Sequence, residues 1–227
     1  SQPSDFAFVL ALIEHIKKIH PIDETRIYLS GFSMGSMMSN AMACAYPDVF
    51  AAASALNAQH FGYLSNMAKM IMSVGMGPKP SEEKLNEISH TKILADEAKK
   101  IKDYRMPVIQ FSGLLDNLSN PWPISSEEDL WIKTINYWKA YNHIPVTPFK
   151  INTAYETGLT SDETRLVCAD ERFIHHLWYT SDTHEPLYQF LVAKRMPHAV
   201  DLREIELAWN FMKHYSRSAD GTLNTKE

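Results

Sequence analysis

Gly31, Ser33 and Gly35 form a Gly-x-Ser-x-Gly pattern, which is typical of a serine presented for nucleophilic attack. The run at 26–30 contains Ile, Tyr and Leu and predicts a short strand, and the small residues at 36–45 predict a helix. A strand that enters a helix through so tight a turn forces strained backbone angles on the central serine. Small residues on either side let neighbouring chain pass close by. We therefore expect the Ser33 hydroxyl to stand above the edge of a sheet as a nucleophile.

Asp116 and His198 are the candidate acid and base that such a serine needs. Asp116 follows a predicted strand at 107–111, and His198 follows a predicted strand at 187–194. Loops that leave the carboxyl ends of parallel strands meet at one rim of the sheet. The chain order Ser, Asp, His is the order that α/β-hydrolases use.

Other residues compete for these roles, and a metal centre is a further alternative. For the acid and the base they are Asp129, Asp162, His175, His176 and His184. Two of the histidines are neighbours in a predicted strand, so their side chains point to opposite faces and do not readily share one ion. We expect no metal and no cofactor.

The elements that must position these residues alternate between strand and helix patterns. This alternation predicts an α/β fold, with a mostly parallel sheet covered by helices on both faces. The last helix, which begins at 201, should bury its apolar residues. The predicted elements are helices at 6–16, 36–45, 126–141 and 201–212, strands at 26–30, 51–56, 107–111, 172–179 and 187–194, and buried last-helix residues Leu202, Ile205, Ala208, Trp209 and Met212.

Residues 61–105 interrupt the alternation and read as an insertion. They contain four methionines, a break at 75–78 and a charged helix from about residue 82 to 102. Methionine is flexible and polarizable, so it suits an adaptable apolar mouth. We expect one domain at 1–217 in which 61–105 form a cap over the site, followed by a frayed tail at 218–227.

Composition excludes several classes of protein. The 227 residues carry a net charge of −5 and no basic run interleaved with aromatics, so no nucleic-acid partner is expected. No apolar stretch reaches the length of about 18 residues that spans a bilayer. Cys44 and Cys168 can form one disulfide, but buried thiols are favoured, and both a secreted and a cytoplasmic location stay open.

The segments 26–38 and 46–52 resemble serine esterases grouped with polyhydroxybutyrate depolymerases and feruloyl esterases. The resemblance continues at 107–116, 196–198 and 208–212. It implies that Ser33 is the nucleophile, Asp116 the acid and His198 the base of an acyl-enzyme mechanism. The amide of Met34 would then donate to the oxyanion. Two departures, Ser36 in place of a second glycine and Ser112 in place of a histidine, weaken the transfer of substrates from relatives.

Hydrolases of this fold resemble one another in having about four strands before the strand that leads into the nucleophilic serine, which is called the elbow strand. In this sequence only one predicted helix precedes the predicted elbow strand at 26–30. The apolar run at 27–29 would then be an exposed sheet edge, which natural proteins avoid. We therefore expect the carboxyl-terminal part of a longer fold, with an upstream segment completing the sheet.

The expected activity is hydrolysis of hydroxycinnamoyl (feruloyl-type), polyester or plant-wall esters. Aromatic residues could line the acyl pocket, although core packing explains them equally well. The alternatives are a catalytically silent binding protein of the same fold and a serine peptidase. The candidate substrate-binding residues are Phe32, His60, Phe61 and Trp122.

Overall fold

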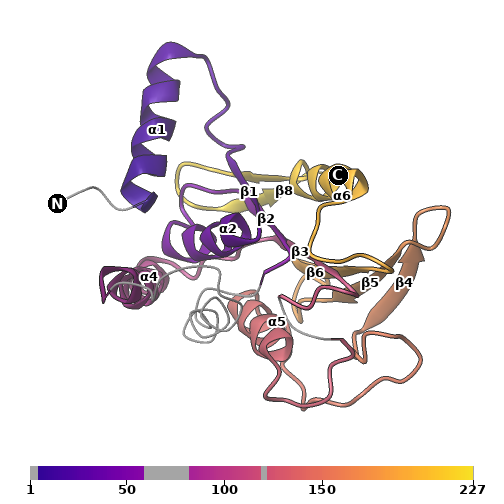
Figure 1. Ribbon diagram of the computed structural model, residues 1–227. Coiled ribbons are helices and arrows are strands. Elements are labelled where there is room, and N and C mark those ends of the chain that lie inside the picture. Colours follow the sequence, from indigo (N-terminus) through magenta and orange to yellow (C-terminus); the bar gives the residue numbers. More distant parts are fainter. Residues whose placement is uncertain (1–4, 59–81, 119–121, 227) are drawn as a thin grey trace.

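The computed structural model describes residues 5–58, 82–118 and 122–226 (Figure 1). Its main sheet has six strands in the order β1-β2-β3-β6-β5-β4. The first four of these run parallel, and β5 and β4 extend the sheet as antiparallel neighbours. The strands are β1 (Tyr28–Phe32), β2 (Ala52–Leu56), β3 (Val108–Gly113), β6 (Tyr188–Ala193), β5 (Phe173–Trp178) and β4 (Glu163–Val167).

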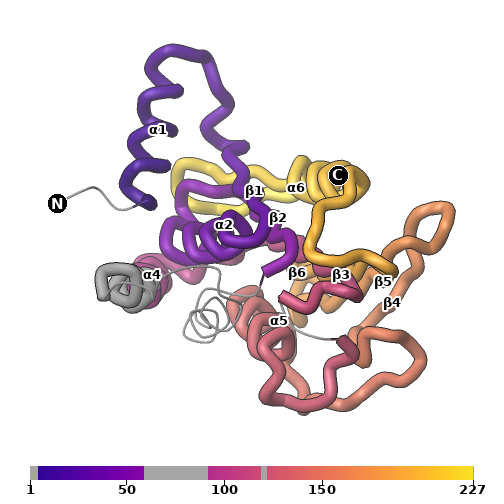
Figure 2. The backbone as a smooth tube through the Cα atoms, in the orientation of Figure 1, coloured from indigo at the N-terminus to yellow at the C-terminus, as the bar shows by residue number. Residues whose placement is uncertain are grey.

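Helices cover both faces of this sheet, which confirms the predicted α/β class. Helices α2, α4 and α5 lie on one side of the sheet and α6 on the other (Figures 1 and 2). One cluster of buried residues joins α2, α4 and α5 to the sheet, and a second lies beneath α6. The central strands β2 and β3 are buried along their whole length, as expected of parallel strands covered on both faces. The helices are α1 (Asp5–Ile19), α2 (Met34–Ala45), α4 (Glu82–Ile101), α5 (Leu130–Tyr141) and α6 (Leu202–Met212).

Helix α5 begins later than the pattern predicted, because Asp129 and not Ser126 is its cap. The Asp129 side chain accepts from the Trp131 amide at 2.9 Å. The predicted apolar face is confirmed, since Trp131, Ile135 and Trp138 are buried. This helix therefore anchors one face of the sheet through its aromatic residues.

The range expected to be an insertion contains an ordinary connection of the sheet. Helix α4 leads back from β2 to β3, and its residues Ala95 and Ala98 are buried. Residues 82–101 thus belong to the helical layer beside α2. Residues 59–81, which contain the first part of the expected cap and all four of its methionines, lie outside the described residues.

Two expectations at the carboxyl-terminal end are wrong. The tail is not frayed, because β7 (Tyr215–Arg217) and β8 (Leu223–Thr225) pair as an antiparallel hairpin. Helix α6 buries Ala208 and Met212, but Leu202 is 85%, Ile205 49% and Trp209 53% exposed. These three residues, called here the α6 stripe, occur at i, i+3 and i+7, so they share a helix face. That face is therefore largely exposed, although the Trp209 ring packs edge-on against Tyr28 of β1 at 6.1 Å.

Candidate active site

Ser33 occupies the junction between β1 and α2 with φ of 54° and ψ of −116°. Residues other than glycine rarely adopt a positive φ. The Ser33 amide donates to the Leu56 carbonyl at 2.9 Å, which ties this turn to the end of β2. The sequence therefore folds here into the strained elbow that the glycine-serine pattern predicted.

The two glycines of the pattern have different reasons to be small. A Cβ on Gly31 would lie 2.2 Å from the Gly35 carbonyl oxygen, so a side chain at position 31 cannot fit without a backbone shift. A Cβ on Gly35 would meet nothing within 4 Å among the described residues. We expected neighbouring backbone to approach both glycines closely. Among the described residues this is true of Gly31 and not of Gly35.

His198 lies between Ser33 and Asp116. Its Nε2 is 2.9 Å from Ser33 Oγ, and its Nδ1 is 2.8 Å from Asp116 Oδ2. Asp116 is buried, and its other carboxylate oxygen accepts from the Leu118 amide at 3.0 Å. A buried carboxylate beside Nδ1 favours the tautomer that carries its proton on Nδ1, which leaves the Nε2 lone pair for the Ser33 proton. The arrangement can therefore activate a hydroxyl.

Three parallel strands bring this array together, because β1, β3 and β6 end at the same rim. Gly113 ends β3, and a Cβ there would lie 2.2 Å from the Met196 carbonyl oxygen. The Leu115 amide donates to that same oxygen at 2.9 Å. The loop that carries Asp116 and the loop that carries His198 are thus packed directly against each other.

The competing acids and bases are engaged elsewhere. Asp129 caps α5, and Asp162 Oδ2 accepts from the Tyr179 amide at 2.9 Å. His184 stacks on the Tyr179 ring with a 4.4 Å centroid separation. These side chains have structural roles in this fold.

The His175 and His176 side chains face opposite sides of the sheet. Burial lowers the pKa of His175 to about 4 and that of His176 to about 3, so both imidazoles are neutral near pH 7. Nε2 of His175 lies 2.9 Å from Gln189 Oε1, whereas Nε2 of His176 lies 3.0 Å from Thr157 Oγ1. In the described ranges, no three His, Cys, Asp or Glu side chains are placed to hold a metal ion.

The candidate binding residues have different surroundings. The Phe32 ring is 38% exposed and lies 4.9 Å from the His198 ring, so it forms part of the site wall. Trp122 stacks on Trp131 at 5.9 Å and donates to Ser112 Oγ at 3.3 Å, which makes packing its main contribution. His60 and Phe61 lie outside the described residues.

Met34 is the first residue of α2. The amides of a first helical turn have no partner within the helix, and the helix dipole favours negative charge there. Next to Ser33, this amide suits an oxyanion that forms on an attacked carbonyl.

Asn57 is a site residue to which the sequence patterns assigned no role, although it directly follows a predicted buried strand. It is fully buried and bridges the loops of Asp116 and His198. A polar residue directly after an apolar strand is the only local signal that could have marked it.

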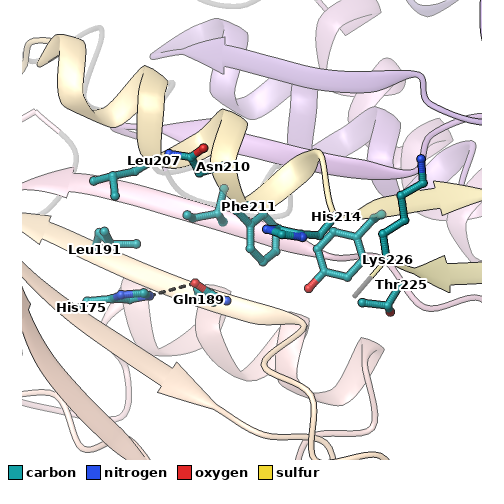
Figure 3. Close-up of a pocket in the computed structure, with 11 residues that line it drawn as sticks. His175, Gln189, Leu191, Leu207, Asn210, Phe211, His214, Thr225 and Lys226 are labelled. Atoms are coloured by element: carbon teal, nitrogen blue, oxygen red, sulfur yellow. Dashed lines mark hydrogen bonds between the residues drawn. The ribbon is translucent and has the colours of Figure 1, made fainter.

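A separate cavity of about 390 Å³ lies between α6, the β7–β8 hairpin and the sheet (Figure 3). Its walls include His175, Gln189, Leu191, Phe211 and His214. Ser33, Asp116 and His198 do not line it, so this cavity is distinct from the array.

Both cysteines are free thiols, Cys44 buried and Cys168 partly buried. Burial raises the pKa of the Cys44 thiol to about 12, so it is not a nucleophile at neutral pH. None of the described helices is long and apolar enough to cross a membrane.

Comparison with known proteins supplies the remaining evidence. A family model described as "Esterase PHB depolymerase" matches residues 2–120. Feruloyl esterase B of Talaromyces funiculosus is 35% identical over 72 residues, which are 31% of this chain and 20% of that protein. Poly(3-hydroxyalkanoate) depolymerase C of Paucimonas lemoignei is 33% identical over 72 residues, which are 31% of this chain and 17% of that protein. The matched stretch therefore spans about a fifth of the length of these relatives.

The solved structure of acetyl xylan esterase from Aspergillus awamori superposes with a TM-score of 0.58 at 15% identity. The match covers 92% of this chain and 66% of that one. At such low identity the likeness shows the fold alone, and it agrees with the α/β-hydrolase fold expected from the sequence.

Proposed function

This chain belongs to the esterase PHB depolymerase family, and from that premise we propose that it carries the catalytic machinery of a serine carboxylic ester hydrolase. The observation that carries the proposal is the hydrogen-bonded line from Ser33 Oγ through the His198 imidazole to the buried Asp116 carboxylate. Family membership supplies the ester chemistry, and the hydrogen-bonded line supplies the residues to perform it.

The proposed reaction is acyl transfer to water in two steps. Ser33 Oγ attacks the ester carbonyl carbon while His198 Nε2 takes the hydroxyl proton. The carbonyl oxygen becomes an oxyanion that the Met34 amide stabilises, and one such donor lowers the barrier by about 3 kcal/mol. When the intermediate collapses, the C–O bond to the alcohol breaks, and the alcohol leaves with the proton from His198.

Water then repeats the sequence on the acyl-enzyme. His198 takes a proton from the water, hydroxide adds to the acyl carbon, and Ser33 leaves with that proton as the acid is released. Asp116 stays ionised throughout, because its role is to stabilise the imidazolium and to fix the tautomer.

Exposed apolar residues lie close to the array in sequence. They favour two kinds of substrate, an ester with an apolar acyl group and the surface of a polyester. Phe32, Met34, Leu115 and Val200 are 38%, 63%, 56% and 40% exposed, and each lies within two residues of a member of the array. The matched relatives are by name a feruloyl esterase and a poly(3-hydroxyalkanoate) depolymerase. Hydroxycinnamoyl esters and polyhydroxyalkanoates are therefore the substrate classes to test first.

The test replaces the array one residue at a time and measures hydrolysis of a short p-nitrophenyl ester. We expect Ser33→Ala, His198→Ala and Asp116→Asn each to lower kcat by several powers of ten with little change in KM, because these groups act in the transition state. Asp162→Asn is the matched control and should keep its kcat.

A fluorophosphonate probe separates an esterase from a silent binding protein. It should label wild-type Ser33 and not Ser33→Ala. Turnover retained in Ser33→Ala, or a wild-type chain that is neither labelled nor active on any ester, would contradict the proposal.

We also propose that further polypeptide pairs with the outer edge of β1. Among the described residues that strand is the last at one end of the sheet, and Trp209 of the α6 stripe lies beside it, with its ring edge-on against Tyr28 at 6.1 Å. An open edge next to exposed apolar residues is a surface that natural proteins cover.

A further inference from the structure

Asn57 directly follows β2 and is fully buried, with φ of 55°. Asparagine tolerates this left-handed conformation better than most residues, because its short polar side chain bonds locally. Its amide donates to the Phe111 carbonyl at 2.9 Å, which holds it against the end of β3. The backbone of Asn57 is therefore held in place, which fixes the point from which its side chain extends.

The Asn57 side chain joins the two loops that carry the acid and the base. Its Oδ1 accepts from the Gly113 amide at 2.8 Å, and its Nδ2 donates to the Ala199 carbonyl at 2.6 Å. Gly113 begins the turn to Asp116, and Ala199 is the neighbour of His198. One amide thus links both partners of the Asp116–His198 hydrogen bond through the backbone.

The residue before Asn57, Leu56, holds the loop of the nucleophile through its backbone carbonyl. The Leu56 carbonyl accepts from the Ser33 amide at 2.9 Å. Two successive residues at the end of β2 therefore tie together the three loops of the array, although neither touches a reacting atom.

The chemistry at this point requires an amide. Gly113 offers a donor and Ala199 an acceptor, so the bridge needs an oxygen and an N–H at fixed positions. An aspartate would keep the acceptor and lose the donor. An apolar residue would leave the buried Gly113 amide unpaired, at a cost of about 1–3 kcal/mol, and would also remove the partner of the part-buried Ala199 carbonyl.

We propose that Asn57 is a positioning residue that holds the Asp116 and His198 loops at the distance where the imidazole reaches both the carboxylate and Ser33. The proposal rests on the proposed esterase function. Misplacement of a reacting group by about 1 Å costs about 10²-fold in rate. We therefore expect Asn57→Ala to lower kcat about 100-fold while KM stays within about threefold.

Asn142 provides a matched control. It is also a fully buried asparagine, and its side chain bridges backbone groups by accepting from the Met106 amide and donating to the Met106 carbonyl, each at 2.8 Å. Asn142 caps the end of α5 and bonds to Met106 just before β3, whereas Asp116 follows the other end of that strand. Asn142→Ala should lose stability as Asn57→Ala does, yet keep its kcat.

Two further variants separate the side chain from the backbone. Asn57→Gly accepts the positive φ without strain and removes the side-chain bonds to Gly113 and Ala199. Asn57→Asp keeps the acceptor for the Gly113 amide and loses the donor to the Ala199 carbonyl. We expect both to fold and both to lose kcat, so a failure of Asn57→Ala to fold still leaves the proposal open to refutation.

The second readout is the downfield proton NMR signal of the His198 Nδ1–H donated to Asp116. It does not depend on substrate, so it tests positioning even if no ester is hydrolysed. The signal should persist in Ser33→Ala and in Asn142→Ala and should be lost or broadened in the Asn57 variants. A retained signal with near wild-type kcat in Asn57→Gly, or an equal loss of kcat in Asn142→Ala, would overturn the proposal.

Discussion

At the scale of single residues, the elbow depends on one missing side chain. Gly31 faces the Gly35 carbonyl at a separation that no Cβ tolerates, whereas Gly35 itself faces open space among the described residues. Only one of the two glycines is therefore required by sterics, and the pair offers a matched experiment in which the same methyl is added at either end of the motif.

We predict that Gly31→Ala shifts the elbow backbone, lowers the free energy of unfolding by about 1–3 kcal/mol and reduces kcat, since overpacking must be relieved by movement of Ser33. Gly35→Ala should fold normally and gain up to about 1 kcal/mol, because alanine is favoured over glycine in a helix. Urea unfolding and ester kinetics on the two variants check this. Equal behaviour of the two alanine variants would show that the close contact does not restrain the turn.

At the scale of elements, α6 joins the array to the carboxyl-terminal hairpin and begins with a capping box. The Asp201 side chain accepts from the Arg203 amide, and Glu204 Oε2 accepts from the Asp201 amide at 3.0 Å. Burial raises the pKa of Glu204 to about 7, while the hydrogen bond from Arg203 helps to lower the pKa of Asp201 to about 2. Of the two carboxyl groups in this cap, Asp201 therefore ionises at low pH and Glu204 ionises only near neutral pH.

Glu204 should make the protein less stable as pH rises. Its folded pKa lies above its ordinary value of 4.5, so the folded state binds more protons than the unfolded state between about pH 4.5 and 7. The stabilisation is complete below pH 4.5 and is lost as pH rises through 7. A shift of this size corresponds to at most about 3 kcal/mol.

We predict that Glu204→Gln raises the free energy of unfolding at pH 8 and changes it little at pH 4.5, because the amide cannot ionise. Denaturant titrations at the two pH values check this, with exposed Glu206→Gln on the same helix as the control. A Gln variant that is destabilised equally at both pH values would mean that the cap needs the carboxylate.

At the scale of the whole molecule, the main sheet has two edge strands in the described ranges, β1 and β4. The β5–β4 pair extends the sheet beyond β6, and β1 is the last strand at the opposite end. The Ile27 carbonyl accepts from Ala51 and the Ser33 amide donates to Leu56, so the odd-numbered residues face β2. In a parallel pair alternate residues face opposite sides, so the amides of Ser30 and Phe32 face outward.

We predict that the amides of Ser30 and Phe32 exchange with solvent much faster than those of Leu29 and Gly31 in this 227-residue chain. We also predict that the exposed α6 stripe promotes self-association at high concentration, and that replacing Leu202 and Ile205 with lysine reduces it by removing exposed apolar surface. Hydrogen exchange followed by NMR and sedimentation velocity test the two parts. Slow exchange at Ser30 and Phe32 in a monomer would show that residues of this chain already cover the edge.

The sequence alone determined the features that depend on local backbone physics. A serine between glycines after a strand predicts the elbow, because only a few conformations connect a strand to a helix so tightly. Alternating strand and helix patterns predict a mostly parallel sheet, and the order of Ser33, Asp116 and His198 along the chain predicts that they meet at one rim. All of this follows from local patterns and from the order of those patterns along the chain.

Only the tertiary structure decided which surfaces are covered and which distant groups bond. The periodicity of α6 marks an apolar stripe without saying that Leu202 stays 85% and Trp209 53% exposed in the described structure. Likewise, nothing near Asn57 in sequence reveals its bonds to Gly113 and Ala199, which lie 56 and 142 residues away. Such contacts depend on how strands pack side by side. The number of residues between two groups along the chain does not determine how far apart those groups lie in the folded protein.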